Sequence, residues 1–534
     1  MHAVAAILTA AAIAYALARA LRVPAIPLLI VAGVVLSRVG HLETETLTDA
    51  LMLGVSFLLF VVGLELDPRR LRAQRDVALR VGTFQFLLLG LLGFAVAAAL
   101  GYGFVESAYL ALAMTASSTL VCVRLLQRRG QLFEPFGRLV LGVLLLQDAL
   151  VLLSIPLVAD LTAGARTALL ALLSIVSLGL FALAIRRWVS PLLLRIANDQ
   201  ELLLLTAMSM LFAFIALAGL LDLPLVVGAF LSGVALSRFP VDGIVRADFA
   251  PIGDFFTAIF FTALGAIVGT PDADALLHSL LFVLVVIVVT PPLVYWLASR
   301  AGFGTKTSVE AGLLLSQTSE LSLVIGLAGM IEEVISPEVF SIIAIASMVT
   351  MLLTPIIANE RVASFIAHLL TRRAGDDAPP PEGHVLLLGV GATGMPLLED
   401  LVLSGSQVVV IDDDPGVARR LGDAGVRTIT GDASDEAVLR RAGVDRARAV
   451  VSTIRRPRDN EALLRARGDV PVLVRVFDER DAHWVREHGG TPVVYSLASA
   501  DNLMEWYEDQ ADDLVERLEA RVGEPAPAPA ATDR

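Results

Sequence analysis

The chain has 534 residues, of which 56% are hydrophobic and 18% charged, and this is too apolar for a protein that is soluble throughout. Apolar segments are almost continuous over residues 1–370, whereas residues 384–520 have the composition of an ordinary charged globular domain. The net charge of −13 comes largely from that second part and argues against a nucleic-acid partner, and the single cysteine, Cys122, excludes an intramolecular disulfide.

About thirteen apolar segments are candidates for transmembrane helices, which need about 20 residues each. The first has no basic n-region and leads into further apolar segments, so we expect a membrane helix there and not a cleaved signal. The candidate spans lie near residues 2–20, 23–40, 47–65, 79–101, 104–123, 136–160, 166–186, 200–221, 223–238, 251–270, 274–299, 308–330 and 335–358.

Basic residues predict the orientation of these spans, because cytoplasmic loops of membrane proteins are enriched in Lys and Arg. One set of alternate loops holds most of the arginines, including Arg69–Arg75 and Arg124–Arg138, whereas the opposite set holds only Arg38 and Arg166. We therefore expect a multi-pass protein of the inner (cytoplasmic) membrane, with its N-terminus outside and its polar C-terminal part in the cytoplasm.

The segment 136–161 holds Gln147 and Asp148 near its middle. A carboxylate at that depth costs about 2.5–3.5 kcal/mol on insertion scales, so intramembrane carboxylates usually have a function. The alternative is a buried ion pair, but no Lys or Arg lies in the middle of any apolar segment. Asp148 is therefore the predicted transport residue.

The sequence also contains an internal repeat. Segment 23–38 resembles segment 223–238, with Gly33 aligned to Gly233, and FLLFVVGLEL in the third span resembles AIFFTALGAIV in the tenth more weakly. The matched spans are seven helices apart, so the two copies must have opposite orientations, as in many secondary transporters. Chance similarity between helices rich in Gly, Leu and Val is the alternative.

Two spans are interrupted by hydroxyl-rich segments. The fifth contains MTASSTLV and the twelfth LSQTSELSL, and an offset of 200 residues places Ser118 and Thr119 opposite Thr318 and Ser319. Such paired breaks predict two discontinuous helices that meet at a binding site, where freed carbonyl and hydroxyl oxygens could coordinate a cation. Alternatively, these hydroxyls only stabilise contacts between helices.

Several motifs in this order are similar to those of Kef-type members of the monovalent cation:proton antiporter-2 family: LLFVVGLELDPRRL (58–71), SST (117–119), LLQD (145–148), GAFLSGVALSR (228–238) and SQTSELSLV (316–324). The resemblance implies a core domain with two crossed, broken helices that moves against a dimerisation domain, and exchange of K+ or Na+ for H+. It implies an ion site formed by Gln147, Asp148, Ser117, Ser118, Thr119, Gln317, Ser319 and Glu320.

The chain departs from this family at two places. Many relatives have a Ser-Glu-Leu-Gly stretch before GLELDP, which is absent here, and the residues after Asp148 differ from those of the potassium-efflux members. A proton and a metal ion compete for one buried carboxylate, so Asp148 alone could support exchange. Because neither a second carboxylate beside it nor a mid-membrane lysine is present, we expect electroneutral exchange. Glu320 is either a second carboxylate of the site or a protonated hydrogen-bonding group.

The polar part begins after a linker over residues 361–383, with the strand HVLLLG leading into the glycine-rich motif at Gly389–Gly394. The next strand, QVVVID, ends at Asp412, about twenty residues further on, which completes a dinucleotide-binding fingerprint. Runs at 426–434, 447–454 and 470–477 continue the βαβ rhythm and predict a parallel sheet. A tight βα turn without a ligand is the alternative.

The IDDDP and GDAS segments and their spacing resemble those of RCK or TrkA-N domains, which sense nucleotides. This resemblance implies a homodimer and a regulatory ligand, either NAD(H) or AMP or another adenine nucleotide; the glutathione response of some relatives is not implied. The expected ligand-binding residues are Gly389, Val390, Gly391, Ala392, Thr393, Gly394, Asp412, Asp413, Gly431, Asp432 and Ala433.

The predicted organisation is therefore a polytopic α-helical exchanger domain (1–360), a cytoplasmic linker (361–383), a Rossmann-like RCK domain (384–500), a C-terminal helix (501–521) and a disordered tail (522–534). The expected partners are monovalent cations, protons and membrane lipid. A nucleotide-gated potassium channel is the alternative function, but the chain lacks a TVGYG-like filter. A membrane-tethered NAD-dependent enzyme is less favoured, because no catalytic constellation is evident.

Overall fold

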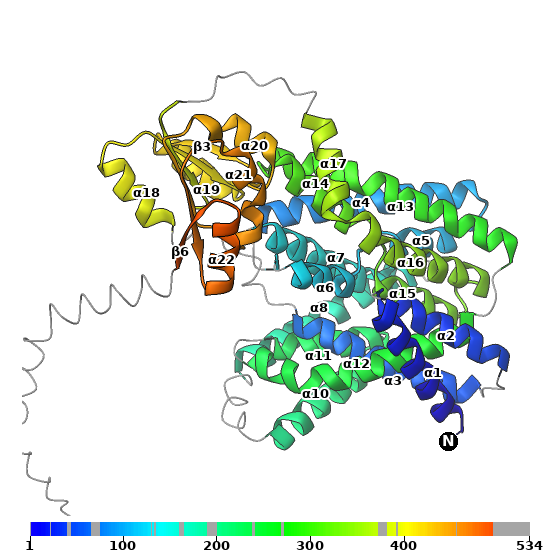
Figure 1. Cartoon of the computed structure of the whole chain (residues 1–534). Helices are drawn as coiled ribbons and strands as arrows, with labels where there is room; N and C mark the ends of the chain where they lie inside the picture. The colour runs from blue at the N-terminus through cyan, green and yellow to red at the C-terminus, as the bar shows by residue number, and fades with distance from the viewer. Residues whose placement is uncertain are drawn as a thin grey trace, which may run out of the picture. The chain divides into compact units, whose positions relative to one another are not determined.

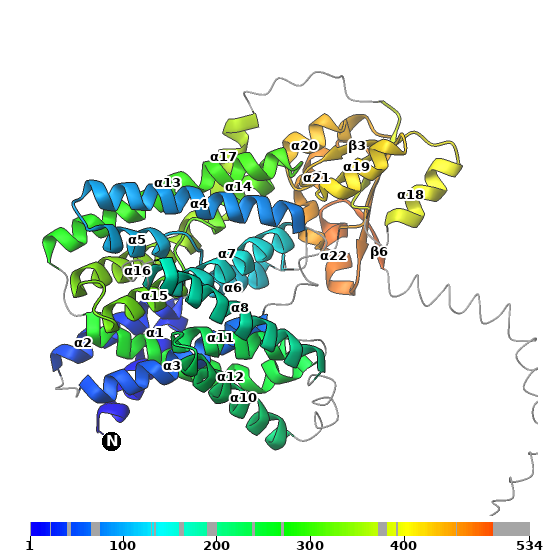
Figure 2. The same ribbon diagram turned by 180° about the vertical axis from the view of Figure 1, so that it is seen from behind.

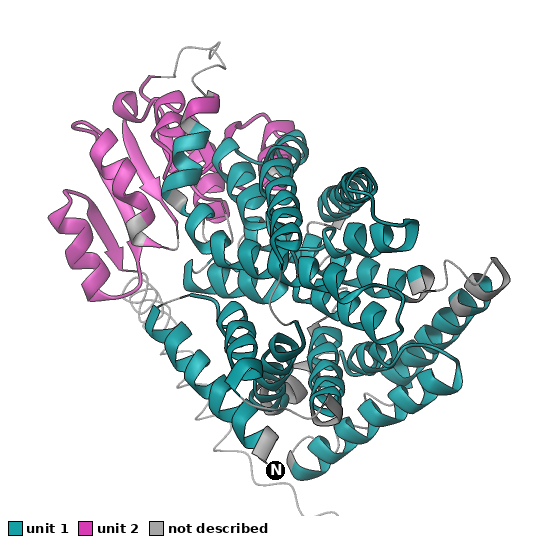
Figure 3. Ribbon diagram, turned by 90° about the vertical axis from the view of Figure 1, so that its right-hand side faces the viewer, with its two compact units in different colours: residues 1–367 teal, residues 368–534 magenta. Residues whose placement is uncertain are grey.

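The computed structural model describes residues 2–21, 23–39, 44–65, 75–129, 131–132, 135–159, 165–188, 200–237, 241–268, 272–371, 382–390, 394–454 and 456–494. The chain divides into two compact units, residues 1–367 and residues 368–534, which Figure 3 shows in teal and magenta. The predicted C-terminal helix and tail lie outside the described residues.

Every regular element of unit 1 is a helix in the described residues. The first half contains α1 (His2–Leu21), α2 (Ala25–Val39), α3 (Thr44–Glu65), α4 (Arg75–Ala99), α5 (Phe104–Ala113), α6 (Thr119–Arg129), α7 (Pro135–Ala159) and α8 (Ala165–Trp188). The second half contains α10 (Gln200–Leu220), α11 (Leu225–Leu236), α12 (Val241–Val268), α13 (Ala273–Arg300), α14 (Thr305–Leu314), α15 (Glu320–Ile331) and α16 (Pro337–Ile357), followed by α17 (Glu360–Thr371).

Each expected span coincides with one of these helices or with a pair of short ones. Of the described helices, eight are long and apolar enough to cross a membrane, and four shorter ones are apolar. The number of thirteen spans stays a prediction. The fifth and twelfth spans are interrupted as expected, since α5 ends at Ala113 before α6 begins at Thr119, and α14 ends at Leu314 before α15 begins at Glu320.

Aligned glycines of the two halves occupy matching contacts. A side chain at Gly33 of α2 would overlap the backbone of α12 at Thr262 and Gly265, and one at Gly233 of α11 would overlap the backbone of α3 at Phe60 and Gly63. Helix α2 therefore packs on α12 through Gly33 and Gly265, and α11 packs on α3 through Gly233 and Gly63 in the same way. Chance similarity of two apolar helices would not produce this exchange of partners, so the structure supports the internal repeat.

A second pair of matching positions follows α4 and α13. Gly101 and Gly302 both have positive φ, +91° and +98°, and each begins a tight turn into the next helix. Ser107 Oγ then donates to the Tyr102 carbonyl at 3.2 Å, as Ser308 Oγ donates to the Phe303 carbonyl at 3.4 Å. The segments GYGF and GFGT are therefore equivalent with an offset of 201 residues, a signal that the sequence interpretation missed.

The helices of unit 1 form two groups, visible in Figures 1 and 2. Helices α1, α2, α3, α10, α11 and α12 form one group, held together by the α2–α12 and α3–α11 contacts. Helices α4 to α7 and α13 to α16 form the other, in which α4 packs on α5, α7 and α13. This second group contains both interrupted helices and is called the core group below.

Unit 2 is a parallel sheet flanked by helices. Its strands are β1 (Val385–Leu388), β2 (Val408–Asp412), β3 (Arg427–Thr430), β4 (Ala449–Ser452), β5 (Val472–Val476) and β6 (Thr491–Val494), in the order β3-β2-β1-β4-β5-β6. The connecting segments include α18 (Gly394–Leu403), α19 (Pro415–Asp423), α20 (Glu436–Arg441), α21 (Glu461–Ala466) and α22 (Glu479–Glu487).

The strand order reverses between β1 and β4, where dinucleotide-binding folds hold their ligand. All strand pairs are parallel, which confirms the predicted parallel sheet. The sixth strand was not expected, because TPVV is short and contains a proline. At the edge of a sheet a proline is tolerated, since no ladder partner needs its N–H.

Candidate ion-binding and nucleotide-binding sites

Helix α7 carries Gln147 and Asp148 into the interior of the core group. It packs against all four short helices, α5, α6, α14 and α15. Asp148 is only 1% exposed and Gln147 is fully buried. Two polar side chains in such surroundings need polar partners, because an unpaired buried polar group is costly.

The first interruption supplies these partners. Asp148 Oδ2 accepts a hydrogen bond of 2.8 Å from Thr119 Oγ1, and Gln147 Oε1 accepts one of 3.2 Å from the Ser117 backbone N–H. Ser118 Oγ accepts from the Val121 N–H and caps α6, of which Thr119 is the first residue. The positive end of the α6 dipole thus lies beside Asp148 and favours negative charge there.

The two interrupted helices are joined by hydrogen bonds across their breaks. Ser117 Oγ donates to the Leu315 carbonyl at 2.7 Å, Cys122 Sγ lies 3.3 Å from the Leu314 carbonyl, and Ser322 Oγ donates to the Ala113 carbonyl. Side chains of each broken helix therefore satisfy carbonyl groups that the other leaves without helical partners. These contacts fix how the two breaks lie against each other.

The second interruption is built like the first. Ser319 accepts from the Leu321 N–H at 3.1 Å and caps α15, of which Glu320 is the first residue. Ser319 therefore corresponds to Ser118, and Glu320 to Thr119, an offset of 201 residues. The expected alignment of Ser118 and Thr119 with Thr318 and Ser319 was therefore wrong by one position. The residues that cap α6 and α15 are the equivalent ones, and these are Ser118 and Ser319.

Gln317 lies in the second break. Among the described residues, its side chain forms no hydrogen bond with α7. Its Nε2 donates to Cys122 Sγ at 3.1 Å and to the Leu314 carbonyl at 3.2 Å. Its Oε1 is buried and accepts no hydrogen bond from the described residues. Glu320 is 1% exposed at the start of α15. The predicted ion-site residues thus meet at one junction, with Ser117 between the two sides.

Gln85 of α4 is a residue of this junction that sequence interpretation missed. It is fully buried, and its Nε2 lies 3.4 Å from Ser117 Oγ. Within the described residues its Oε1 and the Nε2 of Gln147 have no hydrogen-bond partner. The signal was present, because an amide in the middle of an apolar span is unusual. It was overlooked because α4 shows no break.

In unit 2 the glycine-rich turn follows β1. Gly389 has a φ of +78°, which favours glycine, and a side chain at Gly394 would overlap the Gly389 carbonyl. Thr453 Oγ1, at the end of β4, donates to that carbonyl at 2.8 Å. The turn is therefore compact at the switch point of the sheet. Gly391, Ala392 and Thr393 lie outside the described residues.

Asp412 ends β2 and closes the same turn. Its Oδ2 accepts a hydrogen bond of 2.7 Å from the Val390 N–H, and its Oδ1 accepts one of 2.9 Å from the Asp414 N–H. Burial raises the pKa of this carboxyl group above its ordinary value, and the two backbone N–H groups oppose that rise. A carboxylate has further lone pairs, so Asp412 can still accept hydrogen bonds from a ribose.

The remaining predicted nucleotide residues gather at the ends of β2 and β3. Gly431 N–H donates to the Asp412 carbonyl at 3.0 Å, and Asp432 Oδ1 accepts from the Ser434 N–H at 2.8 Å. Ala433 is buried, whereas Asp413 and Asp432 are half-buried. The described members of the set therefore line the carboxyl edge of β1, β2 and β3, where the fold binds dinucleotides.

The architecture is that of a secondary transporter with inverted repeats and interrupted helices, joined to a doubly wound domain of the dinucleotide-binding class. Residues 7–359 match the family model of the transmembrane sodium/hydrogen exchanger, and residues 385–497 match that of the TrkA-N domain. The chain belongs to the sodium/hydrogen exchanger family and carries a C-terminal TrkA-N domain.

Individual relatives agree with this assignment. The chain is 28% identical over 462 residues to the glutathione-regulated potassium-efflux system protein KefC of Salmonella arizonae, covering 83% of this chain and 73% of the relative. It is 29% identical over 471 residues to KefC of Enterobacter sp. strain 638, with the same coverage of both chains. The predicted relationship to Kef-type antiporters is thus confirmed.

A solved structure supports the membrane fold. The sodium proton antiporter MjNhaP1 from Methanocaldococcus jannaschii superposes with a TM-score of 0.50 at 17% identity, covering 69% of this chain and 97% of that one. At this identity the likeness concerns the fold alone. It confirms the expected class of a multi-pass antiporter fold.

Proposed function

We propose that this protein exchanges a monovalent cation, K+ in preference to Na+, for protons by alternating access around Asp148. The observation that carries the proposal is the junction itself, where a buried carboxylate on α7 meets the caps of two interrupted helices. The preference for K+ is supported by relatives named as potassium-efflux systems.

The junction offers ligands suited to a weakly held cation. Asp148 supplies charge, while Thr119, Ser117 and the amide oxygens of Gln147 and Gln317 supply neutral oxygen donors. Bound cation and bound proton exclude one another at Asp148, because each neutralises the same carboxylate. Competition at one site, together with exposure to one side at a time, produces exchange.

The proposed exchange is electroneutral. The sequence has no Lys or Arg in the middle of a span, and Gln147 stands where a second carboxylate beside Asp148 would allow an additional charge. Glu320 is 1% exposed, at the opposite break. In this proposal it stays protonated and does not take part in each cycle. Measurement of the reversal potential tests this, since net charge movement would contradict it.

The decisive experiment uses the full chain in proteoliposomes with an imposed pH gradient. Wild type, Asp148→Asn and the control Asp76→Asn are compared with K+, Na+ and Li+ outside. Asp76 is an exposed carboxylate in the first turn of α4 and lies away from the junction. We expect wild type and the control to dissipate the gradient with K+ most rapidly, and Asp148→Asn to be inactive.

Two results would overturn this function. If Asp148→Asn dissipates the gradient as fast as wild type, Asp148 is structural. If wild type conducts K+ without moving protons, the protein is a channel controlled by its TrkA-N domain.

We further propose that a nucleotide at the glycine-rich turn of unit 2 regulates transport. The ligand is NAD(H) or AMP or another adenine nucleotide, held by the phosphate-binding turn and by Asp412, which accepts from a ribose. Unit 2 then lies in the cytoplasm, with the N-terminus of the chain outside and the protein in the inner membrane as a homodimer. The proposed domain limits are 1–360 for the exchanger, 361–383 for the linker and 384–500 for the sensor.

A further inference from the structure

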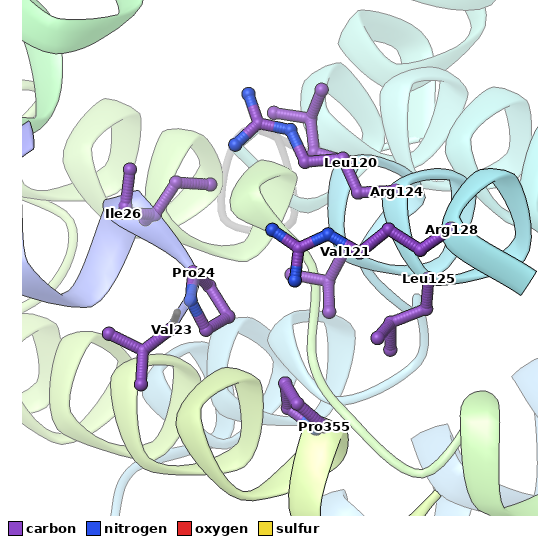
Figure 4. Close-up of a pocket in the computed structure, with 10 residues that line it drawn as sticks. Val23, Pro24, Ile26, Leu120, Val121, Arg124, Leu125, Arg128 and Pro355 are labelled. Atoms are coloured by element: carbon purple, nitrogen blue, oxygen red, sulfur yellow. The ribbon is translucent and has the colours of Figure 1, made fainter. Parts of the chain in front are cut away.

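A pocket of about 50 Å³ lies along α6 and beside the C-terminal end of α16. Its walls come from the α1–α2 turn at Val23 and Pro24, from one face of α6, and from Pro355 in the last turn of α16 (Figure 4). It therefore lies between the core group, which includes α6 and α16, and the other helix group, which includes α1 and α2. The arginines of this pocket and the turn between α1 and α2 belong to the set of loops that the sequence predicts to be cytoplasmic.

Two arginines of α6 line this pocket. Arg124 and Arg128 are one helical turn apart and exposed, and both side chains extend toward Pro24 and Ile26 in Figure 4. In the part of the chain that the structure describes, neither guanidinium has a hydrogen bond or an ion pair, whereas the neighbouring Arg129 donates to the Ala358 carbonyl. Two adjacent guanidinium groups present planar donors in the geometry that suits a phosphate.

The other walls are apolar. Val23, Ile26, Leu120 and Leu125 surround the arginines, and no acidic side chain lines the pocket. Basic pockets between transmembrane helices on the cytoplasmic side bind lipid headgroups, because the phosphate meets the arginines while the glycerol and acyl carbons meet the apolar side chains. Inorganic phosphate would gain the same ion pairs but would leave the apolar walls uncovered.

We propose that this pocket binds the phosphate headgroup of an anionic phospholipid. The two arginines hold the phosphate, and the α1–α2 turn and Pro355 enclose the adjoining apolar part of the lipid. The binding site does not depend on the proposed transport reaction. The bound lipid would contact both helix groups. It would also contact α6, whose first residue, Thr119, donates a hydrogen bond to Asp148.

The test compares wild type, the double variant Arg124→Gln/Arg128→Gln, and the control Arg19→Gln, all as full chains in nanodiscs. Arg19 is an exposed arginine in the last turn of α1, close to the pocket in sequence but outside its walls. Binding of labelled phosphatidylglycerol in a phosphatidylcholine background is measured. We expect the double variant to bind about 30-fold more weakly and each single variant about fivefold more weakly. Arg19→Gln should bind as wild type does.

Each other result counts against the proposal. Equal binding by the double variant and wild type would mean that these arginines only set the topology. A drop of the same size in Arg19→Gln would mean a diffuse surface charge and not a pocket. If inorganic phosphate displaces the labelled lipid from wild type and raises its melting temperature in neutral nanodiscs, the ligand is soluble phosphate. The single variants keep the test valid if the double variant does not fold.

Discussion

At the scale of a single residue, the hydrogen bond from Thr119 to Asp148 is the contact that we expect to set the competition between proton and cation in the proposed exchange. The hydroxyl donates to Asp148 Oδ2 at 2.8 Å, and both groups are buried. A donor of this kind stabilises the ionised carboxylate, which is the form that binds a cation. The donor should therefore determine the pH at which exchange is half-maximal.

Thr119→Val removes this donor while preserving the shape of the side chain. We expect half-maximal exchange to move upward by about one pH unit, because the proton then competes better for Asp148 and a hydrogen bond to a charged group is lost. The measurement is the pH profile of K+-driven exchange in proteoliposomes. Thr115→Val is the matched control, since Thr115 lies in the same break but its Oγ1 donates to the Leu112 carbonyl at the end of α5 and not to Asp148. An unchanged or lower midpoint in Thr119→Val would contradict the assignment.

In unit 2, Asp412 is the single carboxylate that we expect to matter most for nucleotide binding. Asp412→Asn keeps one acceptor for the turn but removes the charge that would hold a ribose. We expect nucleotide affinity to fall by about tenfold or more, measured by calorimetry on the full chain. Asp423→Asn is the control, since Asp423 is an exposed carboxylate at the end of α19 and is not among the expected ligand-binding residues. Equal affinities of wild type and Asp412→Asn would exclude this role.

The pKa of Asp412 also predicts how the stability of unit 2 depends on pH. Burial raises this pKa in the folded state, so the protonated form is favoured there more than in the unfolded chain. The contribution is fully present below the unfolded pKa and is lost as pH rises through the folded pKa. Thermal unfolding followed across this range should show the loss in wild type and not in Asp412→Asn. The same pH dependence in both proteins would assign it to another group.

At the scale of whole elements, close backbone contacts at glycines hold the two repeats together. A side chain at Gly233 would overlap the Phe60 carbonyl and approach Gly63, and both neighbours are backbone and cannot rotate away. The contact permits α3 and α11 to approach closely, which is the usual role of small residues between membrane helices.

Gly233→Ala should therefore destabilise unit 1 by about 1–3 kcal/mol, as overpacking usually does. Thermal unfolding in detergent, followed by tryptophan fluorescence, measures the change. Gly219→Ala is the control, because Gly219 also lies in a helix but a side chain there would meet no atom within 4 Å. Similar melting temperatures for the two variants would show that the α3–α11 contact can relax.

At the scale of the whole molecule, the question is whether unit 2 controls unit 1. NAD+, NADH and AMP, supplied on the side of unit 2, should change the exchange rate of wild type and leave Asp412→Asn unchanged. Coupling between two sites is reciprocal, so the transported cation should also change nucleotide affinity. Flux and nucleotide binding measured on the same proteoliposomes test both directions. A nucleotide response that persists in Asp412→Asn would place the regulatory ligand elsewhere.

Much of the fold follows from local sequence. Apolar length predicts where helices lie in unit 1, and alternating short strands with a glycine-rich turn predict the sheet of unit 2. The breaks at 114–118 and 315–319 were also predictable, since runs of hydroxyl residues compete with the helical backbone for hydrogen bonds. The edge strand β6 was not predictable, because its four residues have no marked strand pattern.

The sequence by itself determined the class of protein, the two broken helices and the presence of a carboxylate, Asp148, within an apolar span, because an acidic residue in such a span is visible without coordinates. Only the tertiary structure brought Gln85 to Ser117, joined Cys122 to Leu314, and placed the arginines of α6 beside the α1–α2 turn. Those contacts join residues between about 30 and 190 positions apart. They depend on how helices pack, and helix packing is decided by the shapes of many side chains together, whereas helix formation is decided by neighbours along the chain.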